Sequence, residues 1–393
     1  MNILIVSPQI PYPLWGAGTR NYQLLKALAQ RHTVSLLSLA TGFKMPDDYV
    51  AELEKYVRGA FHLFTPSPSS RRRDQLLHTL HGTSYILESH LLSEIQQTID
   101  KLFTACTYDA VLFESSLVAG YSLPRRVKVI IDQHNIEHEL LRRTYQNEKK
   151  WLRKWYNWRE YRLVRAAEFE RCRKADAIAV TSERERSILQ SELPESFIEV
   201  VPNGVDIEYF NGNTLQEVEG HIVFTGSLEY YPNVDAVLSF ARNCWPRLRA
   251  KLPGVIWQIV GKNPLPEVRR LADLPGVRVF GSVEDTRPYI ASSQVAIAPL
   301  AIGSGTRLKI LEAFAMRKAV VSTSIGCEGL AVEPGKHLLV ADQPEAFADA
   351  IIDLLGNRER RQALGSAGRS LVESCYSWQQ SGDRLLAILD KLG

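Results

Sequence analysis

Short apolar runs alternate along the chain with longer stretches in which apolar residues recur at helical spacing. The runs are rich in β-branched residues, which is typical of strands in a parallel sheet covered by helices on both faces. In the first half we predict strands at 3–6, 34–39, 110–113, 127–131, 177–181 and 198–201. In the second half we predict strands at 222–225, 256–260, 277–280, 295–298, 319–322 and 338–340. The pattern therefore predicts an α/β protein whose second half repeats the architecture of the first.

A chain of 393 residues is long enough for two cores. A polar stretch at about 210–220, containing Gly and Asn, separates the two series of strands. We predict two doubly wound, Rossmann-like domains, residues 1–209 and 210–375, followed by a closing segment, 376–393. Sheets of this kind bind ligands beyond the carboxyl ends of their strands, so we expect the site in a cleft where the domains face each other.

The composition matches a soluble globular protein, with 45% hydrophobic and 23% charged residues. A net charge of +3 does not demand a nucleic-acid partner, and we expect none. The five cysteines form no C-x-x-C pair, which favours a reducing compartment. The first apolar run has the length of a strand, and no run approaches the roughly 18 residues that span a bilayer. We expect a cytoplasmic protein, at most peripheral to a membrane.

A first glycine-rich turn, Gly16-Ala17-Gly18, lies between the first predicted strand and an amphipathic helix. Glycines at such a turn let backbone N–H groups approach an anion, although a simple tight turn has the same sequence. The third glycine of the dinucleotide fingerprint is missing, which argues against NAD.

A second glycine-rich turn follows the strand at 295–298 and opens a helix. It contains Gly303, Ser304, Gly305 and Thr306, with Arg307 and Lys309 directly after it. Cations at a helix start oppose the helix dipole unless an anion is bound, so this segment predicts an anion site. Glu312 in the same helix could accept hydrogen bonds from ribose hydroxyls. The alternative is a capped helix with a solvated basic first turn.

Several segments together resemble the retaining glycosyltransferases of family 4, which have the GT-B fold. They are Gly16-Ala17-Gly18, Asp132-Gln133-His134-Asn135, Lys174-Ala175-Asp176, Val201-Pro202-Asn203-Gly204-Val205-Asp206 and the stretch 303–315. The resemblance covers nearly the whole chain. Within the family, the chain is most similar to the sugar transferases of bacterial exopolysaccharide gene clusters. It implies that the closing helix, within 376–393, crosses back onto the first domain.

The resemblance implies a retaining transfer of a sugar from a nucleotide-sugar to an acceptor hydroxyl, in polysaccharide, glycolipid or other glycoconjugate synthesis. The acceptor would be a sugar, a lipid-linked molecule or a small molecule. It gives His134 the donor sugar to bind, and we expect His134, Arg307 and Lys309 to be the catalytic residues, with the two cations stabilising the charge on the leaving diphosphate. The expected nucleotide-sugar contacts are Gly226, Gly281, Gly303, Ser304, Gly305, Thr306, Leu308 and Glu312. The expected acceptor-side loop contains Gly16, Ala17, Gly18, Arg20 and Asn135.

The chain departs from the family pattern at two places. Family members commonly carry two glutamates eight positions apart. Glu312 is the second of them, and Ser304 stands where the first would be. Members also often carry an Arg and a Lys after the first strand of the second domain, whereas Gly226 here is followed by Ser227-Leu228-Glu229. Our hypothesis is that Arg307 and Lys309 supply the missing cations. No Asp-x-Asp occurs, so we expect no metal and no other cofactor.

A zinc site is the alternative role for His134, because His138 lies four positions later on the same helical face. Glu137 is wrongly placed for H-E-x-x-H, and no third ligand follows nearby. A structural histidine or a substrate contact is favoured over zinc.

Residues 142–174 carry twelve Arg or Lys against four Glu, and Trp151, Trp155 and Trp158 recur at helical spacing within them. One interpretation is a core-packed helix with a solvated basic face. The other is an interfacial segment that meets anionic lipid or a lipid-linked acceptor. Arg71, Arg72 and Arg73, with Leu76, Leu77 and Leu80, could extend that surface.

Two rival functions share the predicted fold. A nucleotide-sugar epimerase or hydrolase would consume donor without acceptor. A non-catalytic binding protein would hold a nucleotide-sugar and release no nucleotide.

Overall fold

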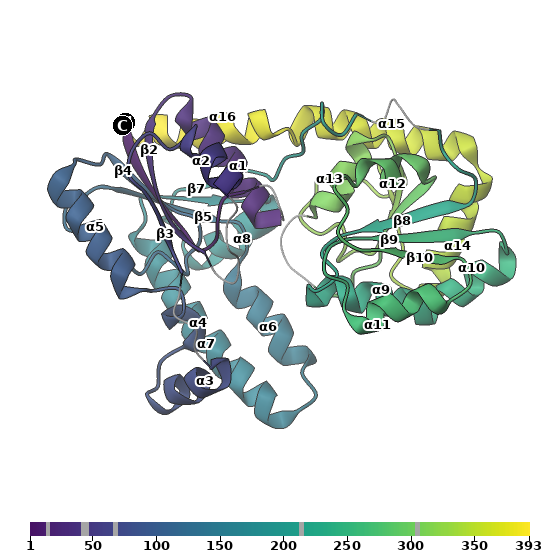
Figure 1. Ribbon diagram of the computed structural model, residues 1–393, viewed down its shortest axis with the longest axis horizontal. Helices are drawn as coiled ribbons and strands as arrows, with labels where there is room; N and C mark the ends of the chain where they lie inside the picture. Colours follow the sequence, from purple (N-terminus) through teal and green to yellow (C-terminus); the bar gives the residue numbers. More distant parts are fainter. Residues whose placement is uncertain (13–15, 41–46, 66–69, 212–215, 303–306) are drawn as a thin grey trace. The chain divides into compact units, whose positions relative to one another are not determined.

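The computed structural model describes residues 1–393 apart from 13–15, 41–46, 66–69, 212–215 and 303–306 (Figure 1). The chain divides into two compact units. Unit 1 contains residues Met1–Pro202 and Ser381–Gly393, and unit 2 contains Asn203–Gln380.

Unit 1 is built on a seven-stranded parallel sheet in the order β3-β2-β1-β4-β5-β6-β7. Its strands are β1 (Asn2–Ser7), β2 (Thr33–Leu39), β3 (Phe61–Phe64), β4 (Ala110–Phe113), β5 (Lys128–Gln133), β6 (Ala177–Val180) and β7 (Ile198–Val200). Its helices are α1 (Gly16–Ala29), α2 (Asp47–Glu54), α3 (Arg71–Leu80), α4 (Tyr85–Glu88), α5 (Ser93–Ala105), α6 (Glu137–Asn147), α7 (Trp151–Lys174), α8 (Glu183–Glu192) and most of α16 (Trp378–Leu392).

Unit 2 has a six-stranded parallel sheet in the order β10-β9-β8-β11-β12-β13. Its strands are β8 (His221–Thr225), β9 (Ile256–Val260), β10 (Val277–Phe280), β11 (Val295–Ala298), β12 (Ala319–Ser322) and β13 (Leu339–Val340). Its helices are α9 (Tyr231–Asn243), α10 (Trp245–Lys251), α11 (Pro266–Arg269), the 3₁₀ turn η1 (Arg270–Asp273), α12 (Arg287–Ser292), α13 (Leu308–Ala315), α14 (Pro344–Gly356) and α15 (Arg358–Cys375).

Each sheet is buried on both faces because successive residues of its strands point to opposite sides. In β1, Ile3 and Ile5 pack with α1 and α16, whereas Leu4 and Val6 pack with α5, α7 and α8. In β8, Phe224 packs with α9, α10 and α14, and Val223 packs with α13 and α15. The near-continuous apolar runs of the sequence therefore correspond to two-sided cores.

All twelve predicted strands are present, within one to two residues of their predicted ends. The sequence analysis missed β3, whose half-exposed residues lie at the edge of the sheet. Both sheets follow the Rossmann order, in which the strand order reverses between the first and fourth strands, here β1 and β4 or β8 and β11.

The unit boundaries, after Pro202 and Gln380, differ from those expected after 209 and 375. The backbone N–H of Val205 donates to the carbonyl of Tyr376 at 2.8 Å, and the Val205 side chain is buried in the core of unit 2. At the other end, Leu385, Leu386 and Leu389 of α16 are buried in the core of unit 1. The segment around Val205 therefore belongs to the core of unit 2, and the end of α16 belongs to the core of unit 1.

The Trp-rich helix α7 is not core-packed along its first half. Trp151 is 76% exposed, Trp155 50% and Trp158 40%. The buried residues of α7 lie from Glu160 onward, where the helix reaches the sheet. Among the described residues, no helix combines the length and apolar character needed to cross a membrane.

Candidate functional site

The turn between β8 and α9 brings backbone and side chains unusually close together. Gly226 has φ +152°, and a Cβ there would lie 2.8 Å from Asn233 Nδ2 and 2.9 Å from Lys309 Nζ. The amide of Asn233 in turn donates to the carbonyl of Ser227 at 2.9 Å. Glycine is required here because any larger residue would displace both side chains.

Lys309 extends from the first turn of α13 to this glycine. Its Nζ donates to Asn233 Oδ1 at 2.8 Å and lies 3.9 Å from the centroid of the Phe224 ring. No carboxylate of the described residues forms an ion pair with it. Burial, and then the charge of Arg307, lower the pKa of Lys309 to about 7. The amine is therefore held by a neutral amide and an aromatic face, and an anion placed beside it would restore its charge.

Arg307 directly precedes α13 and is half-buried. Its charge acts on Lys309, so the two cations lie close together at the start of one helix. Gly303, Ser304, Gly305 and Thr306, which were predicted to bind the nucleotide-sugar, lie outside the described residues.

Glu312 lies one turn further along α13, on the side of Lys309. Burial raises its pKa to about 7, and Lys309 opposes that rise. Its carboxylate forms no hydrogen bond or ion pair with the described residues. Leu308, another predicted contact, is half-buried and packs against the core on the α13 face of the sheet.

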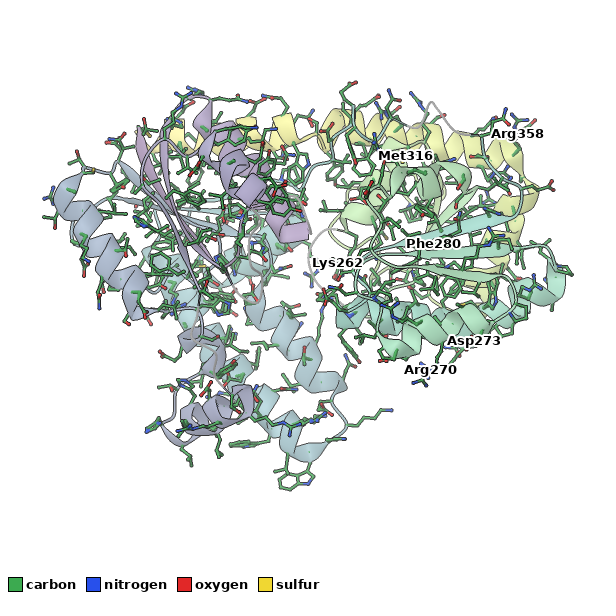
Figure 2. The ribbon with its side chains drawn as sticks, viewed as in Figure 1. Lys262, Arg270, Asp273, Phe280, Met316 and Arg358 are labelled. Atoms are coloured by element: carbon green, nitrogen blue, oxygen red, sulfur yellow. The ribbon has the colours of Figure 1, made fainter. Side chains whose placement is uncertain are left out.

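The adjoining turn after β9 contains Lys262, a cation that the sequence pattern did not indicate (Figure 2). A Cβ on the preceding Gly261 would lie 1.7 Å from the carbonyl oxygen of Gly226. The backbone N–H of Leu228 donates to the carbonyl of Lys262 at 2.9 Å, and burial lowers the pKa of Lys262. No sequence pattern marks this lysine; only the close approach of two turns brings it to this edge. Gly281, at the end of β10, has open space around its Cα.

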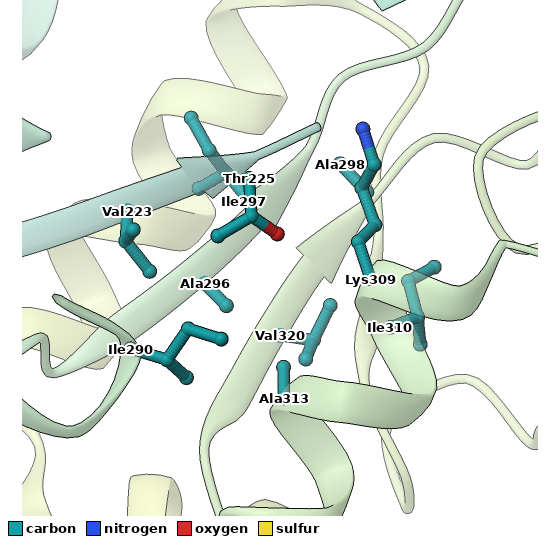
Figure 3. Close-up of a pocket in the computed structure, with 10 residues that line it drawn as sticks. All are labelled: Val223, Thr225, Ile290, Ala296, Ile297, Ala298, Lys309, Ile310, Ala313 and Val320. Carbon is teal, nitrogen blue, oxygen red and sulfur yellow. The ribbon is translucent and has the colours of Figure 1, made fainter. Parts of the chain in front are cut away.

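A small apolar cavity lies beneath this edge, among β8, β11, β12, α12 and α13 (Figure 3). Its walls include Val223, Ile290, Ala296 and Ala313, and the stem of Lys309 reaches it while the amine points away. Its volume is about 10 Å³, room for about one water molecule. A sugar or nucleotide does not fit there.

The corresponding edge of unit 1 carries charges that neutralise one another. Arg20 donates from Nε and Nη2 to the two oxygens of Asp132, at 2.8 and 2.7 Å, and both side chains are fully buried. Gly16, Ala17, Gly18 and Arg20, which we expected in an acceptor-side loop, belong to α1, because this helix begins at Gly16. Arg20 therefore orients β5 against α1 and presents no surface to an acceptor.

A second buried carboxylate lies beside this pair, at the end of β4. Glu114 Oε2 accepts from Asn21 Nδ2 at 2.6 Å, and the same amide reaches Ser7 Oγ at 3.3 Å. Burial raises the pKa of Glu114 to about 8. Glu114 Oε1 and Asn21 Oδ1 are buried and have no hydrogen-bond partner among the described residues.

His134 follows β5 at the same edge and is half-buried, as is Asn135 beside it. Burial lowers the pKa of His134, so its imidazole is neutral at pH 7. His134 Nδ1 is buried without a hydrogen-bond partner among the described residues.

The neighbouring His138 has a structural role. Its Nδ1 bonds Glu168, whose carboxylate also accepts from the backbone N–H groups of Glu137 and His138 at 2.9 and 3.2 Å. Glu168 thus caps the N-terminus of α6, where a carboxylate is favoured. The described part of the chain contains no group of three or more His, Cys, Asp or Glu residues placed to hold a metal ion.

Two family models match the chain. Residues 15–209 match "Glycosyltransferase Family 4", and residues 219–357 match "Glycosyl transferases group 1".

Curated relatives match over part of their length. An uncharacterised 44.6 kDa protein of the cps region of Klebsiella pneumoniae is 26% identical, over 40% of this chain and 42% of that protein. A GDP-mannose-dependent α-(1-6)-phosphatidylinositol monomannoside mannosyltransferase of Mycobacterium tuberculosis is 27% identical, over 54% of this chain and 61% of that protein. The chain thus spans about half the length of these relatives.

Solved structures match over the whole chain. Sucrose-phosphate synthase from Thermosynechococcus elongatus has a TM-score of 0.76 at 17% identity, covering 100% of this chain and 99% of the other. HepE from Anabaena, solved with UDP and glucose, has a TM-score of 0.67 at 14% identity, covering 98% and 99%. At these identities the likeness shows the fold. With the family models, it places the chain among the family 4 glycosyltransferases of GT-B fold.

Proposed function

We propose that this glycosyltransferase transfers a sugar from a nucleotide-sugar to an acceptor hydroxyl with retention of anomeric configuration and without a metal ion. The observation that carries the proposal is Lys309, a half-buried lysine bound by a neutral amide and paired with no described carboxylate. With Arg307 beside it, the edge of unit 2 has positive charge to offer an anion. A diphosphate supplies that anion.

In this proposal the diphosphate of the donor lies at the start of α13, with Arg307 and Lys309 against its oxygens. As the bond between the sugar and the phosphate oxygen breaks, the electron pair remains on the diphosphate, and the two cations stabilise the developing charge. The acceptor oxygen forms the new bond on the same face of the sugar. Its proton passes to the departing phosphate, so no protein nucleophile is needed.

Further side chains extend the proposal to the rest of the donor. The Glu312 carboxylate, which has no partner among the described residues, accepts hydrogen bonds from the ribose hydroxyls. Lys262 adds a third positive charge at the strand ends, and the neutral imidazole of His134 bonds a sugar hydroxyl. Asn135 and the turn around Gly281 have the exposure to contribute further contacts.

The names of the relatives suggest the setting. One relative belongs to a cps region, and another acts on a phosphatidylinositol mannoside with GDP-mannose. We therefore propose a role in polysaccharide or glycolipid synthesis, with a sugar or lipid-linked acceptor. Because these matches span about half of each relative, neither name assigns a substrate.

The test is a donor-by-acceptor screen on the purified chain, with EDTA present. UDP-, GDP-, ADP- and TDP-sugars are incubated with candidate acceptors, nucleotide release is measured, and the anomeric configuration of any product is read by NMR. We expect acceptor-dependent release from one donor class and a retained anomer. Release that needs no acceptor, an inverted product, or activity abolished by EDTA contradicts the respective part of the proposal.

A further inference from the structure

The junction of α6 and α7 exposes a set of large apolar side chains that the described residues leave uncovered. Trp151, Trp155 and Trp158 recur at i, i+4 and i+7, so they share one face of α7, and Leu152 beside them is 61% exposed. Arg162 continues this face and lies 5.2 Å from the ring of Trp158. Soluble proteins rarely leave three tryptophans of one helix in water, so this face indicates a binding partner.

Four cations at the start of α7 have no ion-pair partner among the described residues. Lys149, Lys150, Arg153 and Lys154 are exposed, and none forms an ion pair with the described residues. The nearby Glu148 accepts from the backbone N–H of Lys150 at 2.9 Å. Positive charge at the junction is therefore left for a partner.

Further along α7 some cations do meet carboxylates. Arg159 pairs with Glu160 at 2.9 Å, Arg165 with Glu192 at 2.8 Å, and Lys174 with Glu170 at 2.6 Å. Lys149, Lys150, Arg153 and Lys154 at the start of the helix have no such pair among the described residues.

The helix α3 brings a second apolar face to the same region. Leu76 and Leu80 are 61% and 74% exposed, and Arg72 and Arg73 of the same helix are exposed without an ion-pair partner among the described residues. Arg159 Nη2 of α7 donates to the carbonyls of His78 and Thr83 at 3.1 and 2.9 Å. These bonds fix the end of α3 against α7, and within unit 1 α3 lies away from the strands (Figure 1).

We propose that these two helix faces dock the protein onto an anionic lipid bilayer. The docking surface consists of Trp151, Leu152, Trp155, Trp158, Leu76, Leu77 and Leu80, ringed by Arg72, Arg73, Lys149, Lys150, Arg153 and Lys154. Tryptophan rings prefer the headgroup level of a membrane, and lysine and arginine are attracted to anionic headgroups. This inference is independent of the sugar-transfer proposal.

Charge favours a bilayer over a second copy of this chain. A symmetric dimer through the docking surface would bring the same unpaired cations of both copies together, which is repulsive. A bilayer containing acidic lipid supplies the opposite charge and an apolar layer for the tryptophans and leucines at the same time.

The test is co-sedimentation of the whole chain with vesicles of phosphatidylcholine alone and of phosphatidylcholine mixed with phosphatidylglycerol. We expect binding to the mixed vesicles that weakens with added salt. Replacing Lys149, Lys150, Arg153 and Lys154 by Glu is expected to weaken it roughly tenfold or more. Replacing Trp151, Trp155 and Trp158 by Ser should weaken it by about tenfold.

Matched controls lie on unit 2. The pair Val218→Ser and Leu274→Ser removes exposed apolar side chains, and the pair Arg270→Glu and Arg358→Glu reverses exposed charges. Both control pairs should bind vesicles as the parent chain does, and thermal unfolding verifies that every variant is folded.

Three results would overturn the proposal: absence of binding to the mixed vesicles, equal binding by the tryptophan variant, and concentration-dependent self-association that the tryptophan variant abolishes. The last result would assign the surface to a second copy. Because no step requires turnover, failure here leaves the sugar-transfer proposal untouched.

Discussion

The two sheets have the same strand order, yet their carboxyl edges treat charge differently. In unit 1, Asp132 binds the guanidinium of Arg20 with both of its carboxylate oxygens, and both side chains are fully buried. In unit 2, Lys309 is bound by the amide of Asn233 and faces the Phe224 ring. One edge neutralises its own charge, whereas the other holds a lysine with no ion-pair partner among the described residues.

This difference shows that the side chains, and not the fold alone, determine what the carboxyl edge of a sheet does. A Rossmann-like sheet offers a ligand position where the strand order reverses, but the charges there determine whether the position binds an anion or serves packing. In our proposal the Arg20–Asp132 pair of unit 1 serves packing, whereas Lys309 of unit 2 meets an anion. Substitutions at the two edges should accordingly affect different properties.

The largest expected effect is on the stability of unit 1. Asp132→Ala leaves the Arg20 guanidinium buried without its carboxylate, which should lower the free energy of unfolding by about 3–5 kcal/mol. The matched control is Asp349→Ala, which breaks a pair with Arg247 that is 39% and 44% exposed. That change should cost about 1 kcal/mol or less. Urea unfolding measures both variants. An equal loss of unfolding free energy in the two would contradict the distinction between the buried pair and the exposed pair.

The next effect is on catalysis at the edge of unit 2. Arg307→Ala should lower kcat/KM by about 10²- to 10³-fold, equivalent to about 2.7–4 kcal/mol of transition-state stabilisation, with little change in unfolding. Arg270→Ala removes an exposed arginine of the same unit and is the control. A loss of less than about threefold would remove Arg307 from the catalytic assignment.

A smaller effect is expected from a single methyl group at the β8–α9 turn. In Gly226→Ala, the new Cβ would displace Asn233 and Lys309, so the donor Kd should rise about tenfold. Gly254→Ala adds the same methyl group where no atom lies within 4 Å. If calorimetry finds the two variants equal, the close contact at Gly226 does not organise the site.

The smallest effect concerns pH. The free protein has Lys309 with a pKa of about 7, and a bound anion should raise that pKa because it favours the charged amine. Binding then takes up a proton above pH 7, so affinity should fall about fivefold between pH 7 and pH 8. Lys309→Arg keeps its charge throughout and should flatten this dependence. A parallel decline in both proteins would place the titration elsewhere.

The sequence predicted the strands well because a two-sided sheet imposes continuous apolar runs, as in 295–298 and 319–322. It missed β3 because Phe61–Phe64 is a short edge strand with half-exposed side chains. The helical spacing of Trp151, Trp155 and Trp158 correctly placed them on one face. Spacing alone could not show whether that face was covered, and the structure leaves it open.

The site was predictable only where a local pattern marks it. Arg307, Lys309 and Glu312 follow a glycine-rich segment, and this pattern made them candidates. Lys262 follows β9 and Asn233 lies in α9, so both reach this edge only through the tertiary fold. The partner of Arg20 lies 112 positions away, and no local pattern predicts such a pair.

The most direct test of the account is calorimetric titration of UDP, GDP, ADP and TDP into the protein and into Lys309→Met, with EDTA present throughout. The account predicts that one nucleoside diphosphate binds the parent protein despite the chelator and that Lys309→Met, folded normally, binds it at least about tenfold more weakly. Absence of binding by every nucleotide, or equal affinity in Lys309→Met, would contradict the anion site at the carboxyl edge of unit 2.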